Sequence, residues 1–177
     1  MRFLSILGPA WLLATSVAGE GELTGFPANP YDPYCGMACL RSLSSLMLDC
    51  SSHEGEMLGM MEMMTSSECW ANNEPYLTSL AWCMKTKCAE ASVPVYKLEK
   101  FWETDGTGQT SAGVKVVPAK WSYAETLTHI NKPPTFRLSR TDTELNQTSL
   151  VNEDVYRAQW NVLTSIQEEV TKENGFG

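Results

Sequence analysis

The sequence is poor in basic residues and in histidine, and this excludes several classes of function. Thirteen lysines and arginines stand against 21 aspartates and glutamates, which gives a formal net charge of −8. Nucleic-acid phosphates are bound mainly by lysine and arginine, so we expect no nucleic-acid partner. The chain has only two histidines and no H-E-x-x-H zinc motif, and it has no G-x-S-x-G nucleophile motif.

Long apolar runs are missing after the first 18 residues, so we expect no membrane span in the mature chain. Residues 1–18 combine the basic Arg2, an apolar stretch, and small residues at Ser16 and Ala18, where signal peptidase cleaves. A membrane anchor is the alternative, but this stretch is short and Gly8-Pro9 interrupts it. We predict a cleaved signal peptide at 1–18 and an extracellular location, free or at the outer face of the plasma membrane.

The cysteines predict a disulfide framework. All six follow the signal peptide: Cys35, Cys39, Cys50, Cys69, Cys83 and Cys88. An even number of cysteines in a secreted chain is typical of disulfides, here three. A structural zinc site is the alternative, but the C-x3-C and C-x4-C spacings differ from the paired C-x2-C of such sites.

The pairing of the cysteines is open at this stage, because six can be joined in many ways. Helical geometry favours one arrangement. Cys35 and Cys39 are one helical turn apart, and Cys83 and Cys88 are about one turn apart on a second helix. Antiparallel packing of these helices would give three disulfides: Cys39–Cys83, Cys35–Cys88 and Cys50–Cys69.

The overall pattern predicts a mainly α fold, a small disulfide-stapled helical domain with irregular loops. After the signal peptide we distinguish four parts: an extended lead-in at 19–34, a Cys-rich helical subdomain at 35–103, a Gly/Thr/Ser-rich linker at 104–120, and a helical C-terminal part at 121–177. The linker contains Gly106-Thr107-Gly108, but the glycine pattern of a dinucleotide site is incomplete there.

Apolar spacing and capping residues predict the helices of the Cys-rich part. Apolar residues three and four apart indicate a helix at 35–48. Thr65 and Glu68 form a candidate capping box for a short helix, and Asn73 begins a stronger one that runs through Cys88.

Further helices are predicted after residue 91. Ser92 and Pro94 begin a helix over 95–103, which Gly106 helps to end. Ser122 opens a second capping box, and its helix ends near residue 130.

Asn152 caps the last helix. Its expected buried stripe is Tyr156, Trp160, Leu163, Ile166 and Val170. Core packing is the expected role of five tryptophans: Trp70, Trp82, Trp102, Trp121 and Trp160. Between residues 135 and 151 the pattern alternates weakly and indicates short extended pieces.

Methionines are concentrated in the segment between Cys50 and Cys69. They are Met57, Met60, Met61, Met63 and Met64, with His53 nearby. Thioether sulfur is a soft ligand that suits Cu(I), and imidazole can join such a site. The alternative is that the methionines fill an irregular gap, for which their flexible side chains are suited. These six residues are our candidate metal site, for Cu(I) or Fe(III) bound transiently.

One N-glycosylation sequon is present, Asn146-Gln147-Thr148. In a secreted chain we expect Asn146 to carry a glycan. An ordinary exposed turn is the alternative explanation of this tripeptide.

Six blocks of sequence follow one another in order: YCGMACLRSLSSLMLDCSS, TSSECWANNEPYLTSLAWCMKTKC, VPVYKLEKFWE, KWSYAETL, PPTFRLSR and LNQTSLVNEDVYRAQW. Together they resemble the N-terminal extracellular domain of filamentous-fungal ferric reductases. The resemblance runs from about Tyr31 to the C-terminus. The order of the blocks is more specific than any single motif described above.

The resemblance implies a domain outside the cell, in a family that continues into a haem-bearing transmembrane bundle and a cytosolic module for FAD and NADPH. In that family, electrons from NADPH reduce Fe(III), and often Cu(II), before uptake. This chain stops at Gly177, about where the first membrane helix of the family begins. It has neither the paired haem histidines nor the flavin and nicotinamide motifs, so no catalytic residue can be carried over.

We therefore expect a domain that is not an enzyme by itself and binds no resident cofactor. It would present a metal ion or metal chelate for reductive iron uptake at the outer mouth of a transmembrane reductase part, its expected partner. The alternative is a free-standing secreted Cys-rich protein that is a binding or effector-like module. A third hypothesis is a purely structural shield for the membrane part.

Overall fold

The computed structural model describes residues 31–51, 56–57, 60–61, 65–107 and 117–173. These residues form a mainly helical domain with three disulfides, which confirms the predicted fold class. Among the described helices, none combines the length and the apolar character that crossing a bilayer requires. The signal peptide at 1–18 and most of the lead-in at 19–34 lie outside the described residues.

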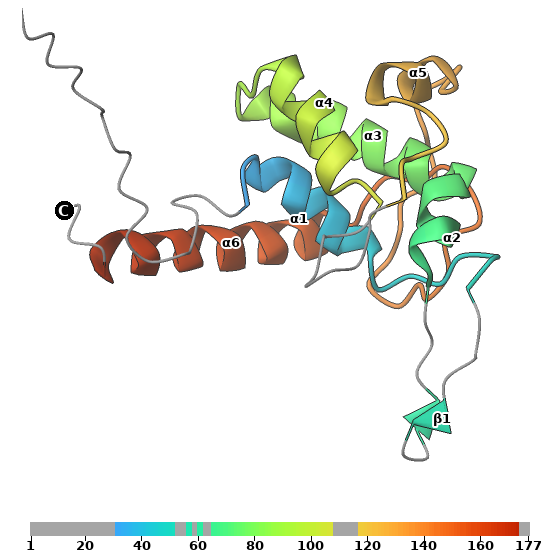
Figure 1. The fold of residues 1–177 in the computed structure, drawn as a ribbon, viewed down its shortest axis with the longest axis horizontal. Coiled ribbons are helices and arrows are strands. Elements are labelled where there is room, and N and C mark those ends of the chain that lie inside the picture. The colour runs from blue at the N-terminus through green and yellow to red at the C-terminus, as the bar shows by residue number, and fades with distance from the viewer. Residues whose placement is uncertain (1–30, 52–55, 58–59, 62–64, 108–116, 174–177) are drawn as a thin grey trace, which may run out of the picture.

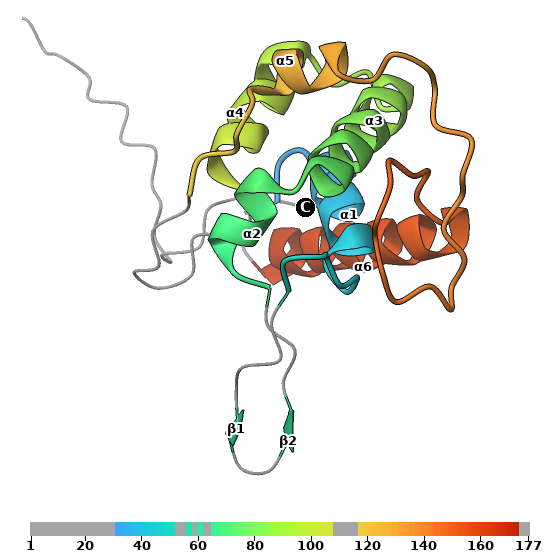
Figure 2. The same ribbon diagram turned by 90° about the vertical axis from the view of Figure 1, so that its right-hand side faces the viewer.

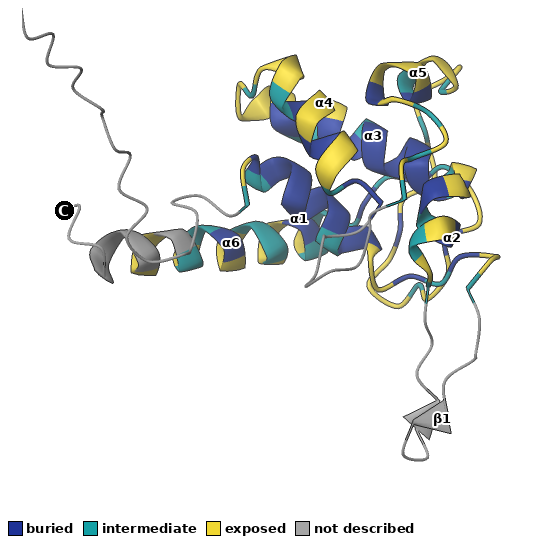
Figure 3. Cartoon of the chain, in the orientation of Figure 1, coloured by how far each residue is buried: buried dark blue, intermediate teal, exposed yellow. Residues whose placement is uncertain are grey.

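Helix α1, Tyr34–Leu43, lies at the centre of the domain. It is buried on almost every side because α6, Glu153–Glu173, packs on one side of it and α3, Glu74–Glu90, on the other. Figure 1 and Figure 2 show α1 between these two longer helices, and Figure 3 shows that its surface is almost entirely buried. The core therefore has three helical layers, with α1 as the middle one.

Helix α1 is shorter than the sequence predicts. Apolar spacing predicts a helix through Leu48, but α1 ends at Leu43. The reason is tertiary: the backbone N–H of Met47 donates to the carbonyl of Thr143 at 2.8 Å, and its carbonyl accepts from Leu145 N–H at 2.8 Å. This pairing with a distant segment replaces the last helical turn.

The next two helices begin at capping side chains. Asn73 caps α3 as predicted, because its side-chain oxygen accepts a backbone N–H of the first turn. Helix α2, Ser67–Asn72, is capped by Ser66 rather than by the predicted Thr65. Thr65 instead shares a 2.7 Å hydrogen bond with the hydroxyl of Ser51. The predicted apolar face of α3 is fully buried: Leu77, Leu80, Ala81, Met84 and Cys88.

Helix α4, Val95–Thr104, follows a turn in which Ser92 has a positive φ of 55°. Pro94 is its N-cap, so Ser92 belongs to the turn and not to the helix start. Gly106 ends the helix as predicted, since its N–H donates to carbonyls of the last turn. A side chain at this position would place a Cβ 2.6 Å from the carbonyl oxygen of Trp102, so only glycine fits.

Helix α5, Tyr123–Thr128, begins at the predicted capping box of Ser122 and Glu125. It ends at Thr128, two residues before the expected end. Most of the predicted linker, residues 108–116, lies outside the described residues. The chain beyond it is tied to α2, because Lys120 N–H donates to a carbonyl of that helix at 2.8 Å.

Asn152 caps α6 as predicted, and its side-chain oxygen accepts the N–H groups of Asp154 and Val155. In the expected stripe, Tyr156 and Leu163 are buried, whereas Trp160 and Ile166 are half-buried. The side chain of Val170 is not described. Figure 3 shows the reason: α6 continues past the end of α1, so burial decreases along the helix.

The expected core packing of the tryptophans is confirmed for four of the five. Trp102 is buried in the core, and its indole N–H donates to the carbonyl of Trp121 at 2.9 Å. Three others are half-buried and pack against the core: Trp70, Trp121 and Trp160. Trp82 is half-buried and does not belong to this group.

The segment between α5 and α6 contains short extended pieces, as expected. Arg137 pairs with Leu150 in an isolated bridge, and Glu144 pairs with Met47 in another. Next to the bridge residues, the segment buries three apolar side chains: Leu138, Leu145 and Val151. It therefore adds to the core although it contains no regular element.

Candidate functional site

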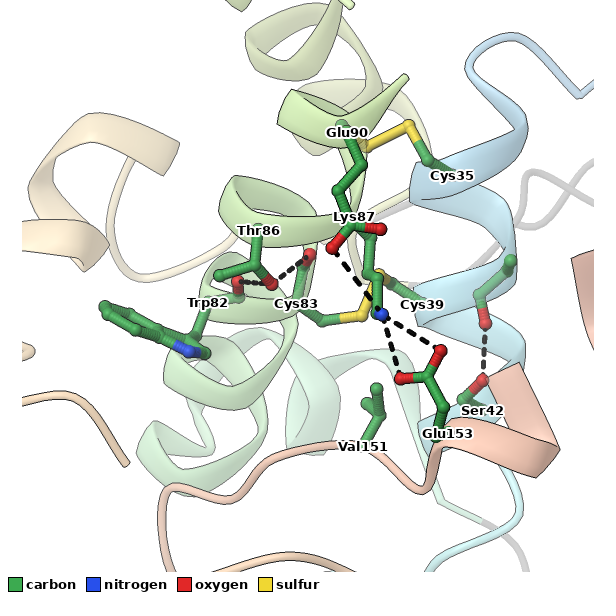
Figure 4. Close-up of a disulfide and its surroundings, with 12 residues drawn as sticks. Cys35, Cys39, Ser42, Trp82, Cys83, Thr86, Lys87, Glu90, Val151 and Glu153 are labelled. Atoms are coloured by element: carbon green, nitrogen blue, oxygen red, sulfur yellow. Dashed lines mark hydrogen bonds and ion pairs between the residues drawn. A yellow bond between two sulfur atoms is a disulfide. The ribbon is translucent and has the colours of Figure 1, made fainter. Parts of the chain in front are cut away.

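The disulfides join Cys35 to Cys88, Cys39 to Cys83, and Cys50 to Cys69. This is the pairing that helical geometry favours. The first two disulfides join α1 to α3 side by side, and Figure 4 shows both between the two helices. No cysteine remains free, so no thiolate is present for a structural zinc site.

The methionine-rich segment contains a small hairpin. Strand β1, Glu56–Met57, pairs antiparallel with β2, Met60–Met61. The register places Met57 opposite Met60 and Glu56 opposite Met61. The other candidate metal ligands, His53, Met63 and Met64, lie outside the described residues. Figure 1 and Figure 2 show both strands apart from the helices.

Two interactions join the two ends of the methionine-rich segment. The Cys50–Cys69 disulfide joins its two ends, and the hydroxyls of Ser51 and Thr65 share a hydrogen bond of 2.7 Å. Ser51 also accepts the backbone N–H of Leu48 at 2.9 Å. The helical body therefore holds the two ends of the segment close together.

Histidine, cysteine and carboxylate side chains form no metal-binding cluster of three or more within the described residues. His129 is exposed and stacks on the indole of Trp121, with ring centroids 3.8 Å apart and planes 18° apart. The predicted site at Met57–Met64 stays a prediction, because its ligands are mainly methionines.

A cleft of about 260 Å³ lies between α3 and the first turns of α6. Its walls carry charged and aromatic side chains together with one alanine: Lys87, Glu90, Ala91, Glu153, Tyr156, Arg157 and Trp160. A second hollow of about 200 Å³ adjoins it and shares Lys87, Glu90 and Glu153. These three residues thus line two neighbouring depressions on one face.

Lys87 is the central side chain of this cleft. It is 15% exposed, and its ammonium donates to both carboxylate oxygens of Glu153, at 2.8 and 3.1 Å. It also lies 5.1 Å from the ring centroid of Tyr156 and 3.8 Å from the carboxylate of Glu90. Figure 4 shows Lys87 between the two glutamates. A cation, two anions and an aromatic ring thus share one site.

The electrostatics of the cleft follow from these contacts. The hydrogen bond from Lys87 is the main reason that the pKa of Glu153 is lowered, and nearby Arg157 and Arg137 act in the same direction. Burial, with the charges of Glu90 and Glu153 adding to it, raises the pKa of the Tyr156 hydroxyl to about 12. Near pH 7, Glu153 is therefore charged and Tyr156 is neutral.

Sequence reasoning missed this cleft. Lys87 and Glu153 are 66 residues apart, and no motif links them. The sequence pattern assigns Tyr156 and Trp160 only to the buried stripe of the last helix, and it predicts no site that includes Glu153. The one available signal was Lys87 itself, a charged residue next to a cysteine on a helix that is otherwise largely buried.

The sequon asparagine, Asn146, is exposed in the segment between α5 and α6. Searches with family models, among curated proteins and among solved structures all give no match to this chain.

Proposed function

We propose that this chain is the extracellular metal-presenting domain of a ferric-reductase-like system, with the segment between Cys50 and Cys69 as its metal contact. The observation that carries the proposal is the register of the hairpin, in which Met57 lies opposite Met60. Directly opposed positions of an antiparallel pair are about 5 Å apart, a spacing that suits two ligands of one ion.

The chemistry of the segment supports a soft, monovalent ion. Thioether sulfur binds Cu(I) in preference to hard cations, and His53 would add an imidazole. Acidic residues accompany the methionines, and the whole chain has a net charge of −8. A negative field of this kind raises the local concentration of cations near the surface. The metal is cargo in this proposal: the domain binds it and passes it on.

The two interactions that join the ends of the segment support a role in presenting a metal ion to a partner. The Cys50–Cys69 disulfide and the Ser51–Thr65 hydrogen bond hold the ends of the segment together, so the place where the segment joins the helical body is defined. A partner that docks on the body would therefore meet the segment at a constant place. The expected partner is the transmembrane reductase part.

The described residues do not fit a haem held by two histidines, the kind implied by the resemblance. Such a site needs two imidazoles, and the histidine among the described residues, His129, is exposed and stacked on Trp121. In this proposal, electron transfer takes place in another chain or another part of the protein. Purified alone, this chain is expected to reduce neither Fe(III) nor Cu(II) with NADPH, and reduction there would refute the proposal of a non-enzymatic domain.

The direct test is a titration of the disulfide-intact mature chain with Cu(I) against a competing chromophoric chelator. We expect one ion to bind with a Kd tighter than ~10 μM. Binding should be lost when Met57, Met60, Met61, Met63 and Met64 are all changed to leucine. Met47→Leu is the matched control, because Met47 lies outside the segment; it should bind like the parent.

Two results of that titration would overturn the metal role. One is a parent chain that shows no binding in this range. The other is a five-leucine variant that binds as well as the parent. Circular dichroism of the five-leucine variant should match that of the parent, because β1 and β2 lie apart from the helices.

One observation favours the alternative of a free-standing secreted binding module. The α3–α6 cleft has the mixed apolar and polar lining of small-ligand sites, although its volume is slightly below their usual range. Sequencing the 3′ end of the transcript separates the two hypotheses. A frame that continues into apolar spans with paired histidines supports the reductase domain, and a stop codon after Gly177 supports the secreted module.

A further inference from the structure

A polar surface hollow of about 280 Å³ surrounds an exposed aromatic side chain near the sequon. It is lined by Phe136, Thr141, Asp142, Thr143, Glu144 and Asn146. Phe136 is 45% exposed and is one of four large apolar side chains exposed within the described residues. An aromatic ring that lies open among hydroxyls and carboxylates is typical of a surface that binds a sugar ring.

The backbone on both sides of Asn146 is fixed. On one side Leu145 is buried, and its N–H donates to the carbonyl of Met47 at 2.8 Å. On the other side Ser149 is buried, and its N–H donates to the hydroxyl of Ser79 in α3 at 2.8 Å. The direction in which the Asn146 side chain leaves the surface is therefore defined by the fold.

The sequon threonine is also bound in the folded chain. The hydroxyls of Thr148 and Thr78 share a hydrogen bond of 2.8 Å. The glycosylating enzyme must reach the threonine hydroxyl of its acceptor sequon, so attachment to Asn146 precedes docking of this segment on α3. The sugar is then already present when the surface beside Asn146 forms.

From these observations we infer that Asn146 carries an N-linked glycan whose first sugar, N-acetylglucosamine, packs in this hollow against the ring of Phe136. The C–H groups of a pyranose face carry partial positive charge, and the face of an aromatic ring is negative, so the two attract each other. The hydroxyls of the sugar face the polar rim, where Thr141, Thr143 and Glu144 offer hydrogen-bond partners. In this arrangement the hollow is filled by a sugar that is covalently attached to Asn146.

The test is a double-mutant cycle on the full chain, secreted from a eukaryotic host. Intact mass before and after enzymatic deglycosylation measures occupancy of Asn146. Thermal unfolding is then compared for the parent, Phe136→Ala, Asn146→Gln and the double variant. We expect Phe136→Ala to lower Tm by ~2–4 °C in the glycosylated chain and by much less in the Asn146→Gln background.

Two controls locate the effect. Val162→Ala removes another exposed apolar side chain, 49% exposed on α6, which does not line the hollow; its effect should be equal in both backgrounds. Trimming the glycan enzymatically to a single N-acetylglucosamine should leave the Phe136 effect unchanged, because only the first sugar contacts the ring.

Three results would overturn the inference. The first is an Asn146 that is unmodified in the secreted chain. The second is a Phe136→Ala effect of equal size with and without the sequon. The third is loss of the effect on trimming to one sugar, which would place the contact farther along the glycan.

Discussion

The two halves of the folded chain are stabilised in different ways. From α1 to α3, three disulfides join elements that are also buried against one another. From α5 to α6 there is no cysteine, and the chain is held by helix capping, by the packing of α6 on α1, and by the pair of Lys87 and Glu153.

This difference shows which part depends on the other. Helix α6 obtains its buried face largely from α1, and α1 is held in place by two disulfides to α3. The C-terminal half is therefore expected to dock only on a folded Cys-rich half. The Cys50–Cys69 disulfide joins the two ends of the methionine-rich segment, so we expect substitutions within that segment to leave the helical core unaffected.

The largest expected effect comes from removing a disulfide between the central helices. Cys39→Ala/Cys83→Ala opens a loop with a sequence separation of 44 and should lower the free energy of unfolding by about 4 kcal/mol. Cys50→Ala/Cys69→Ala opens a separation of 19 and should lower it by about 3 kcal/mol. Urea denaturation measures both. A larger loss from the Cys50–Cys69 variant would contradict the view that the α1–α3 disulfides dominate.

The next effect tests the dependence of α6 on α1. Leu163 is fully buried, so Leu163→Ala should cost about 3 kcal/mol, whereas the neighbouring exposed Val162→Ala should cost less than about 0.5 kcal/mol. If the halves unfold as one unit, hydrogen exchange of α1 amides should also accelerate in the Leu163 variant. Faster exchange confined to α6 would show that the C-terminal half opens independently.

A smaller effect concerns the cap of α6, which no disulfide supports. Asn152→Ala removes the acceptor for two backbone N–H groups and should cost about 1 kcal/mol. Asn152→Asp keeps the acceptor but loses the donor to the carbonyl of Leu138, and should recover most of the stability. If alanine and aspartate are equally destabilising in urea, the bond to Leu138 matters more than the cap.

The smallest effect is a pH dependence across the two halves. The pKa of Glu153 is lower in the folded state, chiefly because Lys87 donates to its carboxylate. Its stabilisation is therefore present above the unfolded pKa of about 4.3 and is lost as pH falls through the folded value. Because the carboxylate is 43% exposed, the contribution is about 1 kcal/mol or less.

The measurement for this pair is the difference in unfolding free energy between the parent and Glu153→Gln from pH 7 to pH 3. The parent should be the more stable at pH 7, and the difference should disappear at the acidic end. A difference that does not change with pH would mean that the charge of Glu153 is not the source of the stabilisation.

Local chemistry explains what could be predicted from the sequence. The starts of α3, α5 and α6 were predictable because Asn73, Ser122 and Asn152 bind N–H groups three residues away or fewer. The pairing of the cysteines was predictable because helical spacing already limits which sulfurs can meet. The predicted cap of α2 was wrong by one residue, because the hydroxyl of Thr65 forms a hydrogen bond with Ser51 and Ser66 caps the helix instead.

Of the candidate sites, the sequence indicated the methionine-rich segment and the sequon, since both are composed of neighbouring residues. It could not indicate the α3–α6 cleft, because Lys87 and Glu153 meet only after α6 has docked on the Cys-rich half. The sequence likewise could not predict that Phe136 lies beside Asn146, because this proximity depends on the fold of the segment between α5 and α6.

The sequence by itself determined the helical class and most helix starts, because these depend on spacing and capping within a few residues. It also favoured, without fixing it, the disulfide pairing that the structure has. Only the tertiary structure decided where α1 ends, which charges meet in the cleft, and which aromatic ring lies beside the sequon. Each of these brings together residues that are not neighbours in the chain, and their proximity results from how the helices and the segment between α5 and α6 pack and not from any local pattern.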